Sequence, residues 1–467
     1  MSEQRFDLVV IGGGPAGQKA AVQAAKAGKR VMLIEKGKSV GGACVRFGTI
    51  PSKTLRETAQ SFGKFHRLTG HVVDVHLPAE LQVQSLLSRK ESVIASHERY
   101  MHAQMQRNGI DFRQGAARFL TPTEVEITAL SGAKTRVSSE FFVIATGSSP
   151  RTPDDVPVDH EHVFDSDSLL SVSYLPESLT VLGSGVIACE YASIFAVLGS
   201  RVTVIDKSPR PLGFLDAELS EHFVRELESD GGRYLGNAKH TNVHFDGLAS
   251  VVTELASGER VESQKLFCAL GRVAQVAGMG LDGIGVKVSA RGLVEVDKDF
   301  RTAQPHIYAV GDVIGPPALA STSMDQGRRA VCHALGIAPG LAKETTPVGI
   351  YTIPELGAVG LSEAEATQRF GGALVGRARF EEVARAQIAA APNGLLKLVA
   401  HPQTGALLGA HAAGEGAADL VHIAQMAIIS GLGFEAFTDI IFNFPTYAEA
   451  YRIAAFDIIG QRARAAR

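Results

Sequence analysis

The N-terminal part of the chain alternates between short apolar runs and a helical pattern. Phe6 to Ile11 is a β-rich apolar run, an alanine-rich stretch follows to about Ala27, and Arg30 to Ile34 is apolar again. Short apolar runs separated by a helical pattern predict a βαβ unit with parallel strands. The design recurs about 170 residues later, with strands expected at Leu179 to Leu182 and at Arg201 to Ile205.

The rest of the chain is divided by its pattern into three further segments. Residues 54–109 predict two helices, the second from about Leu86 to Asn108, and residues 111–144 predict short alternating strands. From about Pro347 short strands and amphipathic helices follow, including a helix from about Ala417 to Ser430. The basic tail with Arg462, Arg464 and Arg467 is expected to be disordered. The predicted fold class is α/β, with two Rossmann-like dinucleotide-binding domains and a C-terminal α+β domain.

A glycine fingerprint lies between the first strand and the first helix. Gly12, Gly14 and Gly17 form G-x-G-x-x-G, and Glu35 ends the second strand about 20 residues further on. The first glycine allows a tight turn, the second lets a pyrophosphate approach the backbone, and the third lets helix and strand pack closely. Glu35 can accept hydrogen bonds from ribose hydroxyls. This site is predicted to bind a dinucleotide at the helix N-terminus.

A second fingerprint occupies the same place in the second unit. Gly183, Gly185 and Ala188 form the G-x-G-x-x-A variant, and Asp206 ends the following strand. An acid there favours NAD, since it binds the ribose 2′-hydroxyl and repels a 2′-phosphate. Lys207 and Arg210 lie just beyond, where they can clamp that phosphate or remain solvated surface charges. The mixture fits a site that admits both NAD and NADP.

Composition limits the class of protein. With 45% hydrophobic residues, 20% charged residues and a net charge of −3, the chain is typical of a globular protein whose main partner is not nucleic acid. The N-terminus lacks a signal-peptide pattern, and no apolar run reaches the roughly 18 residues of a membrane helix. Four cysteines in 467 residues make no disulfide scaffold, so a cytoplasmic protein without a metal site is expected. Buried inert thiols are expected at Cys189, Cys268 and Cys332.

The run from Gly41 to Lys53 carries a family resemblance. It contains Cys44, Thr49 and the Pro51-Ser52-Lys53 turn, and it resembles the flavin-facing segment of the pyridine-nucleotide disulfide oxidoreductases. Members of that family carry two cysteines with four residues between them, and the disulfide takes electrons from the flavin. In this chain Thr49 stands where the second cysteine belongs, and a hydroxyl cannot form a disulfide.

The resemblance assigns FAD to the first fingerprint and a nicotinamide nucleotide to the second. It implies an FAD domain split into residues 1–150 and 271–346, a nicotinamide domain at 151–270 and a dimerisation domain at 347–467. Further FAD contacts are then expected at Cys44, Thr49, Lys53, Thr146, Gly147, Gly311, Asp312, Leu319 and Ala320. Gly271 joins the expected contacts of the nicotinamide nucleotide. The resemblance also implies a pair between Lys53 and Glu190 beside the reacting rings.

A second departure from the family lies near the C-terminus. Disulfide reductases place a histidine before a Pro-Thr, where it moves protons for the thiols of the opposite subunit, and a glutamate five residues after it. Here Glu449 is retained but Phe444 replaces the histidine, and phenylalanine cannot transfer a proton. Nearby His401, His411 and His422 are offset from the motif and are expected to be structural or surface residues.

Losing both the thiol and its proton carrier suggests changed chemistry. The two departures together resemble the soluble, Si-specific pyridine nucleotide transhydrogenases, which implies ping-pong hydride transfer between NADPH and NAD⁺ through FAD in a homodimer. Within enzymes, the alternative is an NAD(P)H:quinone reductase or diaphorase. From a different class, the alternative is a non-catalytic flavin redox sensor that signals through Cys44.

Overall fold

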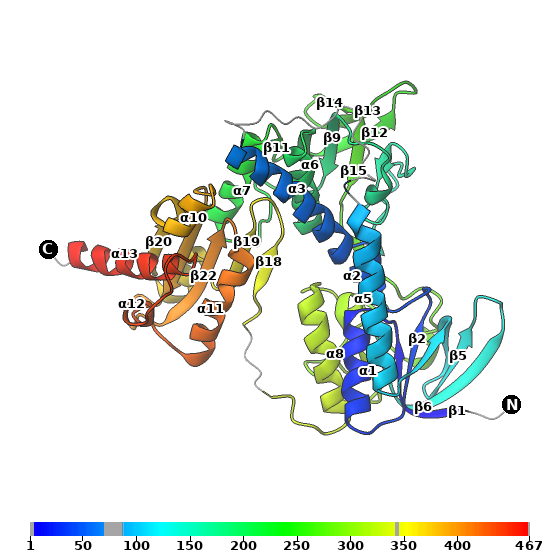
Figure 1. Cartoon of the computed structure of the whole chain (residues 1–467). Helices are drawn as coiled ribbons and strands as arrows, with labels where there is room; N and C mark the ends of the chain where they lie inside the picture. The colour runs from blue at the N-terminus through cyan, green and yellow to red at the C-terminus, as the bar shows by residue number, and fades with distance from the viewer. Residues whose placement is uncertain (1–3, 70–85, 87, 341–344, 466–467) are drawn as a thin grey trace. The chain divides into compact units, whose positions relative to one another are not determined.

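The computed structural model describes residues 4–69, 86, 88–340 and 345–465 (Figure 1). The chain forms two compact units. The first contains Met1–Thr54, Leu87–Arg151 and Gly271–Ala342, and the second contains Leu55–Leu86, Thr152–Leu270 and Lys343–Arg467. Each unit is built from segments that are distant in the sequence.

The first unit is organised around a seven-stranded sheet with a parallel centre. Its order is β3-β2-β1-β6-β5-β4, and β17 also pairs with β6. Its strands are β1 (Gln4–Ile11), β2 (Val31–Glu35), β3 (Asp111–Gln114), β4 (Ala116–Thr121), β5 (Glu124–Thr128), β6 (Lys134–Ile144) and β17 (Ile307–Ala309). β1 pairs in parallel with β2 and β6, while β5 pairs antiparallel with β6. Leu8 and Val10 join the core on one face of this sheet, and Val9 and Ile11 join the core on the other. Burial on both faces explains the continuous apolar run in β1.

Helices α1 (Pro15–Lys26) and α8 (Ala320–Ala334) pack side by side in this unit (Figure 1). Their closest approach is at Gly327, where an added Cβ atom would lie 2.1 Å from the carbonyl oxygen of Ala16. The unit also contains α2 (Gly42–Arg46), α5 (Ser88–Arg107), β7 (Ser148–Pro150) and β16 (Arg272–Ala274). The close packing places the middle of α8 against the first turn of α1.

The second unit repeats the parallel design. The sheet order is β11-β10-β9-β15-β8, and every neighbouring pair is parallel. The strands are β8 (Val163–Phe164), β9 (Ser178–Leu182), β10 (Arg201–Ile205), β11 (Arg233–Leu235) and β15 (Lys265–Cys268), with helices α6 (Val186–Val197) and α7 (Ala217–Ser229). A small antiparallel sheet follows, made of β12 (His240–Phe245), β13 (Val251–Leu255) and β14 (Arg260–Ser263).

The C-terminal segment of the second unit is an antiparallel sheet with helices packed on it. Its order is β18-β19-β22-β21-β20. The strands are β18 (Val348–Ile350), β19 (Leu356–Gly360), β20 (Leu374–Arg379), β21 (Leu395–Ala400) and β22 (Leu407–Ala413), and the helices are α9 (Glu363–Phe370), α10 (Ala384–Ile388), α11 (Ala417–Ser430), α12 (Ala436–Asp439) and α13 (Glu449–Ala465). α11 packs on β19 and β22, and α13 packs on β20 and β21.

The structure confirms most expected elements and corrects two. Helix α3 (Thr49–Thr69) begins at Thr49, five residues before the expected start, so Lys53 lies inside a helix. The predicted disordered tail is wrong for Arg462 and Arg464, which lie in α13, and Arg462 forms an ion pair of 3.2 Å with Glu435. Arg467 and residues 70–85, where part of the two-helix prediction falls, lie outside the described residues.

Within the described ranges, no helix is long and apolar enough to cross a membrane. The same ranges contain no group of three or more His, Cys, Asp or Glu residues placed to hold a metal ion.

Substitution Gly327→Ala should destabilise the first unit because the new methyl group meets the fixed backbone of α1. We expect a loss of about 1–3 kcal/mol in the free energy of unfolding. Urea unfolding followed by circular dichroism measures it. The matched control is Gly283→Ala, because a Cβ atom there would meet no atom within 4 Å. Equal stability of the two variants would contradict the packing described.

Candidate dinucleotide-binding sites

The first glycine-rich turn depends on a backbone approach that only glycine permits. Gly12 has a φ of +107°, and a Cβ atom there would lie 2.2 Å from the carbonyl oxygen of Ala145. A Cβ atom at Gly17 would lie 1.9 Å from the carbonyl oxygen of Gly12. The turn is fixed by a hydrogen bond of 2.8 Å from the Gly12 amide to the Ile34 carbonyl. The roles expected for the first and third glycines therefore have a direct steric basis.

The second glycine-rich turn has the same geometry in the other unit. Gly183 has a φ of +103°, and a Cβ atom there would lie 2.6 Å from the carbonyl oxygen of Ala269. Its amide donates a hydrogen bond of 2.9 Å to the Ile205 carbonyl, as Gly12 does to Ile34. Ala188, in the third position of the fingerprint, is buried at 1% exposure, so its methyl group is accommodated in α6.

The middle glycine of each fingerprint leaves open space. Gly14 is the N-cap of α1 and Gly185 is the N-cap of α6, and neither helix has a side-chain cap. A Cβ atom at either glycine would meet nothing within 4 Å. An uncapped helix N-terminus beside open space suits a pyrophosphate, because backbone amides and the helix dipole both favour an anion. Both cradles therefore fit a dinucleotide.

Acidic side chains end the second strand of each unit and are held by backbone amides. The Glu35 carboxylate accepts hydrogen bonds of 2.7 Å from the amides of Gly13 and Gly37. Asp206 Oδ1 accepts one of 2.7 Å from the amide of Ser208. A carboxylate oxygen has two lone pairs, so both groups retain capacity for ribose hydroxyls.

The two cations that follow Asp206 differ in their surroundings. Lys207 is exposed, as a residue facing a ligand phosphate can be. The Arg210 guanidinium instead donates to the Leu215 carbonyl at 3.0 Å, the Ser220 hydroxyl at 2.9 Å and the Gly213 carbonyl at 2.9 Å. Arg210 thus braces its own loop.

The segment from Gly41 to Lys53 packs directly on the first turn. The Gly41 amide donates to the Gly13 carbonyl at 2.8 Å, and a Cβ atom at Gly42 would lie 2.9 Å from Gly14 Cα. Cys44 lies in α2 and Thr49 begins α3, as the expected proximity to the first dinucleotide requires.

Cys44 is a free, partly buried thiol. Burial raises its pKa above the usual thiol value, although a hydrogen bond with Thr49 and the charge of Lys53 act in the opposite direction. The charge of Asp312 raises the pKa further. The thiol is therefore protonated at neutral pH. The structure brings Cys44, Thr49, Lys53 and Asp312 together within the first unit. Cys189, Cys268 and Cys332 are buried and form no disulfide bond, as expected.

Asp312 is positioned by two residues that sequence reasoning did not select. The Ser148 hydroxyl donates to Asp312 Oδ2 at 2.7 Å, and Arg272 Nε donates to the same hydroxyl at 2.8 Å. Because the guanidinium can only donate, the serine proton is left to the carboxylate. Arg272 also donates to the Ser148 carbonyl at 2.9 Å. The only sequence signal was their position, since Ser148 follows Gly147 and Arg272 follows Gly271, each one residue after a predicted glycine contact.

The remaining expected contacts of the first dinucleotide lie around the same turn. The Thr146 hydroxyl oxygen is buried and has no hydrogen-bond partner among the described residues, which leaves it available to a ligand. Gly147 and Gly311 adopt positive φ angles of +70° and +79°. Leu319 is the N-cap of α8 and Ala320 its first residue, without a side-chain cap.

Lys53 and Glu190 belong to different units, and each is described in its own surroundings. Lys53 Nζ donates to the Ser52 hydroxyl at 3.4 Å. Glu190 is buried at 4% exposure, and its Oε1 accepts a hydrogen bond of 2.9 Å from the Tyr351 amide. Gly271, expected near the nicotinamide nucleotide, is assigned to the first unit by its contacts.

The C-terminal motif residues lie at the surface of the second unit. Phe444 is 74% exposed, and Glu449 is the first residue of α13. His411 is buried and bonds the Leu361 carbonyl at 3.0 Å, His401 Nδ1 accepts from the Gln403 amide, and His422 bonds Gln425. These histidines have the structural or surface roles expected of them.

Substitution Ser148→Ala should weaken FAD binding, because it removes the donor to Asp312 and the acceptor for Arg272. We expect the dissociation constant of FAD to rise about tenfold, the scale of one hydrogen bond to a charged group. Titration of the apoprotein, followed by quenching of flavin fluorescence, measures it. Ser131→Ala, at an exposed turn of the same unit, should leave the constant unchanged. Unaltered affinity in Ser148→Ala would show that the relay does not position Asp312 for the flavin.

Comparison with known proteins places this geometry in a family. A family model described as pyridine nucleotide-disulphide oxidoreductase matches residues 6–327, and its dimerisation domain matches residues 346–455. A crystal structure of LpdA from Mycobacterium tuberculosis aligns with a TM-score of 0.89 at 26% identity, covering 97% of this chain and 99% of that chain. The HOCl-induced flavoprotein disulfide reductase RclA from Escherichia coli aligns with a TM-score of 0.86 at 26% identity, covering 97% and 99%.

Two relatives with a higher sequence identity than these solved structures share one name. A protein named soluble pyridine nucleotide transhydrogenase from Mycobacterium bovis (strain BCG / Pasteur 1173P2) is 41% identical over 464 residues, covering 98% of this chain and 98% of that protein. A protein of the same name from Pseudomonas putida is 39% identical over 467 residues, covering 98% and 99%. On this evidence the chain belongs to the pyridine nucleotide-disulphide oxidoreductase family.

Proposed function

We propose that the protein is an FAD-dependent NAD(P)⁺ transhydrogenase that works by ping-pong hydride transfer between NADPH/NADP⁺ and NAD⁺/NADH. The observation that carries the proposal is the combination of two complete dinucleotide cradles with Thr49 in place of a second thiol. Relatives named soluble pyridine nucleotide transhydrogenase, about 40% identical over nearly the whole chain, support it. The domain boundaries given by the resemblance, with a split FAD domain, are part of the proposal.

The chain's own residues bind and orient the reactants. Bound FAD supplies the two-electron carrier between the nucleotides. Gly12, Gly14 and the N-terminus of α1 hold its pyrophosphate, Glu35 accepts its ribose hydroxyls, and Asp312 anchors it through the Ser148–Arg272 relay. Gly183, Gly185 and the N-terminus of α6 hold the nicotinamide nucleotide in turn. Lys53 and Glu190 are proposed to orient the reacting rings.

The proposed reaction uses no disulfide, because two residues that a disulfide reductase needs are replaced in this chain. Thr49 cannot pair with Cys44, and Phe444 cannot move a proton. Because burial raises the pKa of the Cys44 thiol, little thiolate is present at neutral pH to act as a nucleophile. The reduced flavin is therefore proposed to return its electrons to a second nicotinamide nucleotide.

The C-terminal segment is proposed to form a homodimer. The dimerisation-domain match covers residues 346–455, and this segment exposes large apolar side chains, Ile441 at 93% and Phe444 at 74%, with Phe456 just beyond it at 49%. Exposed apolar side chains of this size favour burial against a partner. A cytoplasmic location is also proposed, because four cysteines that form no disulfide bond suit a reducing compartment.

The activity is tested by an anaerobic assay with NADPH and a spectroscopically distinct NAD⁺ analogue. We expect NADPH to bleach the flavin absorbance, and the NAD⁺ analogue to restore it and to accumulate in reduced form. In stopped-flow experiments, NAD⁺ should reoxidise the NADPH-reduced protein faster than a quinone does. Faster reoxidation by the quinone would favour a quinone reductase, and a reduced flavin that ignores NAD⁺ would refute the proposal.

Substitution Cys44→Ser should leave most of the hydride transfer intact, because the proposed reaction makes no use of a thiol. We expect kcat within about twofold of the parent protein, an effect well under 1 kcal/mol on the barrier. The same anaerobic assay measures it, with flavin content determined from the absorbance spectrum. Loss of transfer at full flavin occupancy would assign Cys44 a chemical role and overturn this assignment.

A further inference from the structure

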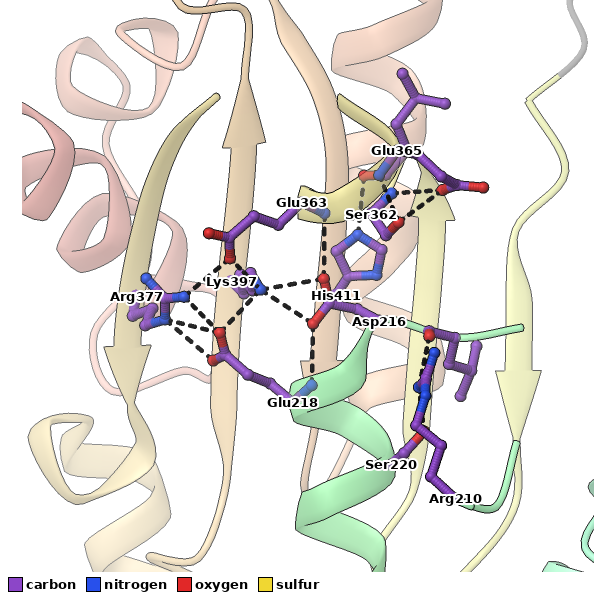
Figure 2. Close-up of polar contacts among 12 residues, drawn as sticks. Arg210, Asp216, Glu218, Ser220, Ser362, Glu363, Glu365, Arg377, Lys397 and His411 are labelled. Carbon is purple, nitrogen blue, oxygen red and sulfur yellow. Dashed lines mark hydrogen bonds and ion pairs between the residues drawn. The ribbon is translucent and has the colours of Figure 1, made fainter. Parts of the chain in front are cut away.

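A cluster of five charged residues lies in the second unit (Figure 2). It contains Lys397 of β21, Arg377 of β20, Glu363 at the start of α9, and Asp216 and Glu218 at the N-terminus of α7. We call these five residues the Lys397 cluster. It joins the C-terminal sheet to the helix that follows the nucleotide-selecting strand β10.

Lys397 is the centre of the cluster and is 2% exposed. Its ammonium group donates to Asp216 Oδ1 at 3.0 Å and Glu218 Oε1 at 2.8 Å, and it lies 2.7 Å from Glu363 Oε2. Arg377 donates to Glu218 through Nε at 3.0 Å and to Glu363 through a terminal nitrogen at 3.1 Å. The ammonium group is satisfied by three carboxylates, and removing any one of them breaks one of the contacts that hold the cluster together.

The cluster is charged at neutral pH. Burial alone would raise the pKa of the Asp216 and Glu218 carboxyls, but the hydrogen bonds that Lys397 donates to both, and that Arg377 donates to Glu218, outweigh it, so the net pKa of each is lowered. Burial would lower the pKa of Lys397, and its three carboxylate partners reverse this so that the pKa is raised. His411, which is adjacent, has a pKa lowered by burial, so it adds no charge.

Asp216 connects the cluster to the 206–215 loop, which runs from the end of β10 to α7. It is the N-cap of α7 and accepts hydrogen bonds from the Glu218 amide at 3.1 Å and the Glu363 amide at 3.2 Å. Arg210 ties the loop to the same helix through Ser220. In the middle of the loop, the Leu212 amide donates a hydrogen bond of 3.0 Å to the carbonyl of Ser184, the residue between Gly183 and Gly185.

The loop is held in a conformation that it would not adopt alone. Leu212 has a φ of +50°, in the left-handed region that a branched side chain rarely occupies, and it is 1% exposed. Such a residue costs of the order of 1–3 kcal/mol and persists only where its surroundings impose it. The fixed ends of the loop supply that constraint: β10 on one side, and Asp216 with its partners from the C-terminal sheet on the other.

We propose that the Lys397 cluster is a positioning device for the nicotinamide nucleotide, which acts through the 206–215 loop by holding Leu212 against the second glycine-rich turn. The C-terminal sheet thereby sets how tightly the turn around Ser184 binds a pyrophosphate. Because Ser184 lies at the part of the site common to NAD and NADP, the cluster controls affinity for both. This inference rests on the nucleotide-binding role proposed for the second turn.

Glu218→Gln is the variant that tests it, because it keeps the shape of the side chain and removes the charge shared by Lys397 and Arg377. Lys397→Met would leave three carboxylates facing one another and is a poorer choice, since it can prevent folding. We expect the dissociation constants of NADP⁺ and NAD⁺ and the KM values of NADPH and NAD⁺ all to rise about tenfold. The value of kcat at saturation and the FAD content should not change. Hydrogen exchange of the 206–216 amides should become faster, and saturating NADP⁺ should slow it again.

Glu259→Gln is the matched control, because it breaks the exposed pair with Arg233 in the same unit, at 3.4 Å, and should change none of these quantities. A lower melting temperature of Glu218→Gln with unchanged dissociation constants would show a merely structural cluster and overturn the proposal. A change confined to one nucleotide would also overturn it. Binding of NADP⁺ is measured apart from turnover, so failure of the transfer reaction in the parent protein is distinguished from failure of this inference.

Discussion

Close approach of one backbone to another at the glycine-rich turns is the constraint on which both nucleotide sites depend. Gly12 faces the carbonyl of Ala145, and Gly183 faces the carbonyl of Ala269, at separations that exclude a side chain. The first turn follows β1 and the second follows β9. The facing carbonyl follows β6 or β15, the parallel neighbour of that strand. The parallel sheets are thus what bring each turn and its uncapped helix N-terminus into position.

The proposed reaction depends on the residue that stands in place of a second thiol, Thr49. The segment packs on the first turn through Gly41 and Gly42, and Thr49 in place of a second cysteine means that it cannot form a disulfide. Under the proposed function, the flavin would receive electrons from one nicotinamide nucleotide, and Thr49 would leave no disulfide to take them. A second nicotinamide nucleotide is the acceptor that the remaining residues support.

In each unit a polar network lies outside the glycine fingerprint and is connected to residues near the site. In the first unit, Arg272 and Ser148 orient Asp312 through bonds whose donors and acceptors are fixed by chemistry. In the second, the ammonium group of Lys397 reaches Asp216 across 181 positions of sequence. Buried networks of this kind are costly unless every member is satisfied, which makes them sensitive to a single substitution.

The sequence by itself determined the two βαβ units, their glycines and acids, and the missing thiol, because these features are local and follow from spacing and residue type. It also predicted α11 at the residues observed. It did not predict that α3 begins at Thr49, that Arg210 braces its loop, or that α13 continues to Ala465. Only the tertiary structure decided these points. It also identified Ser148, Arg272 and Lys397, because the partners of these three residues lie far away in the chain and no short sequence pattern encodes such pairs.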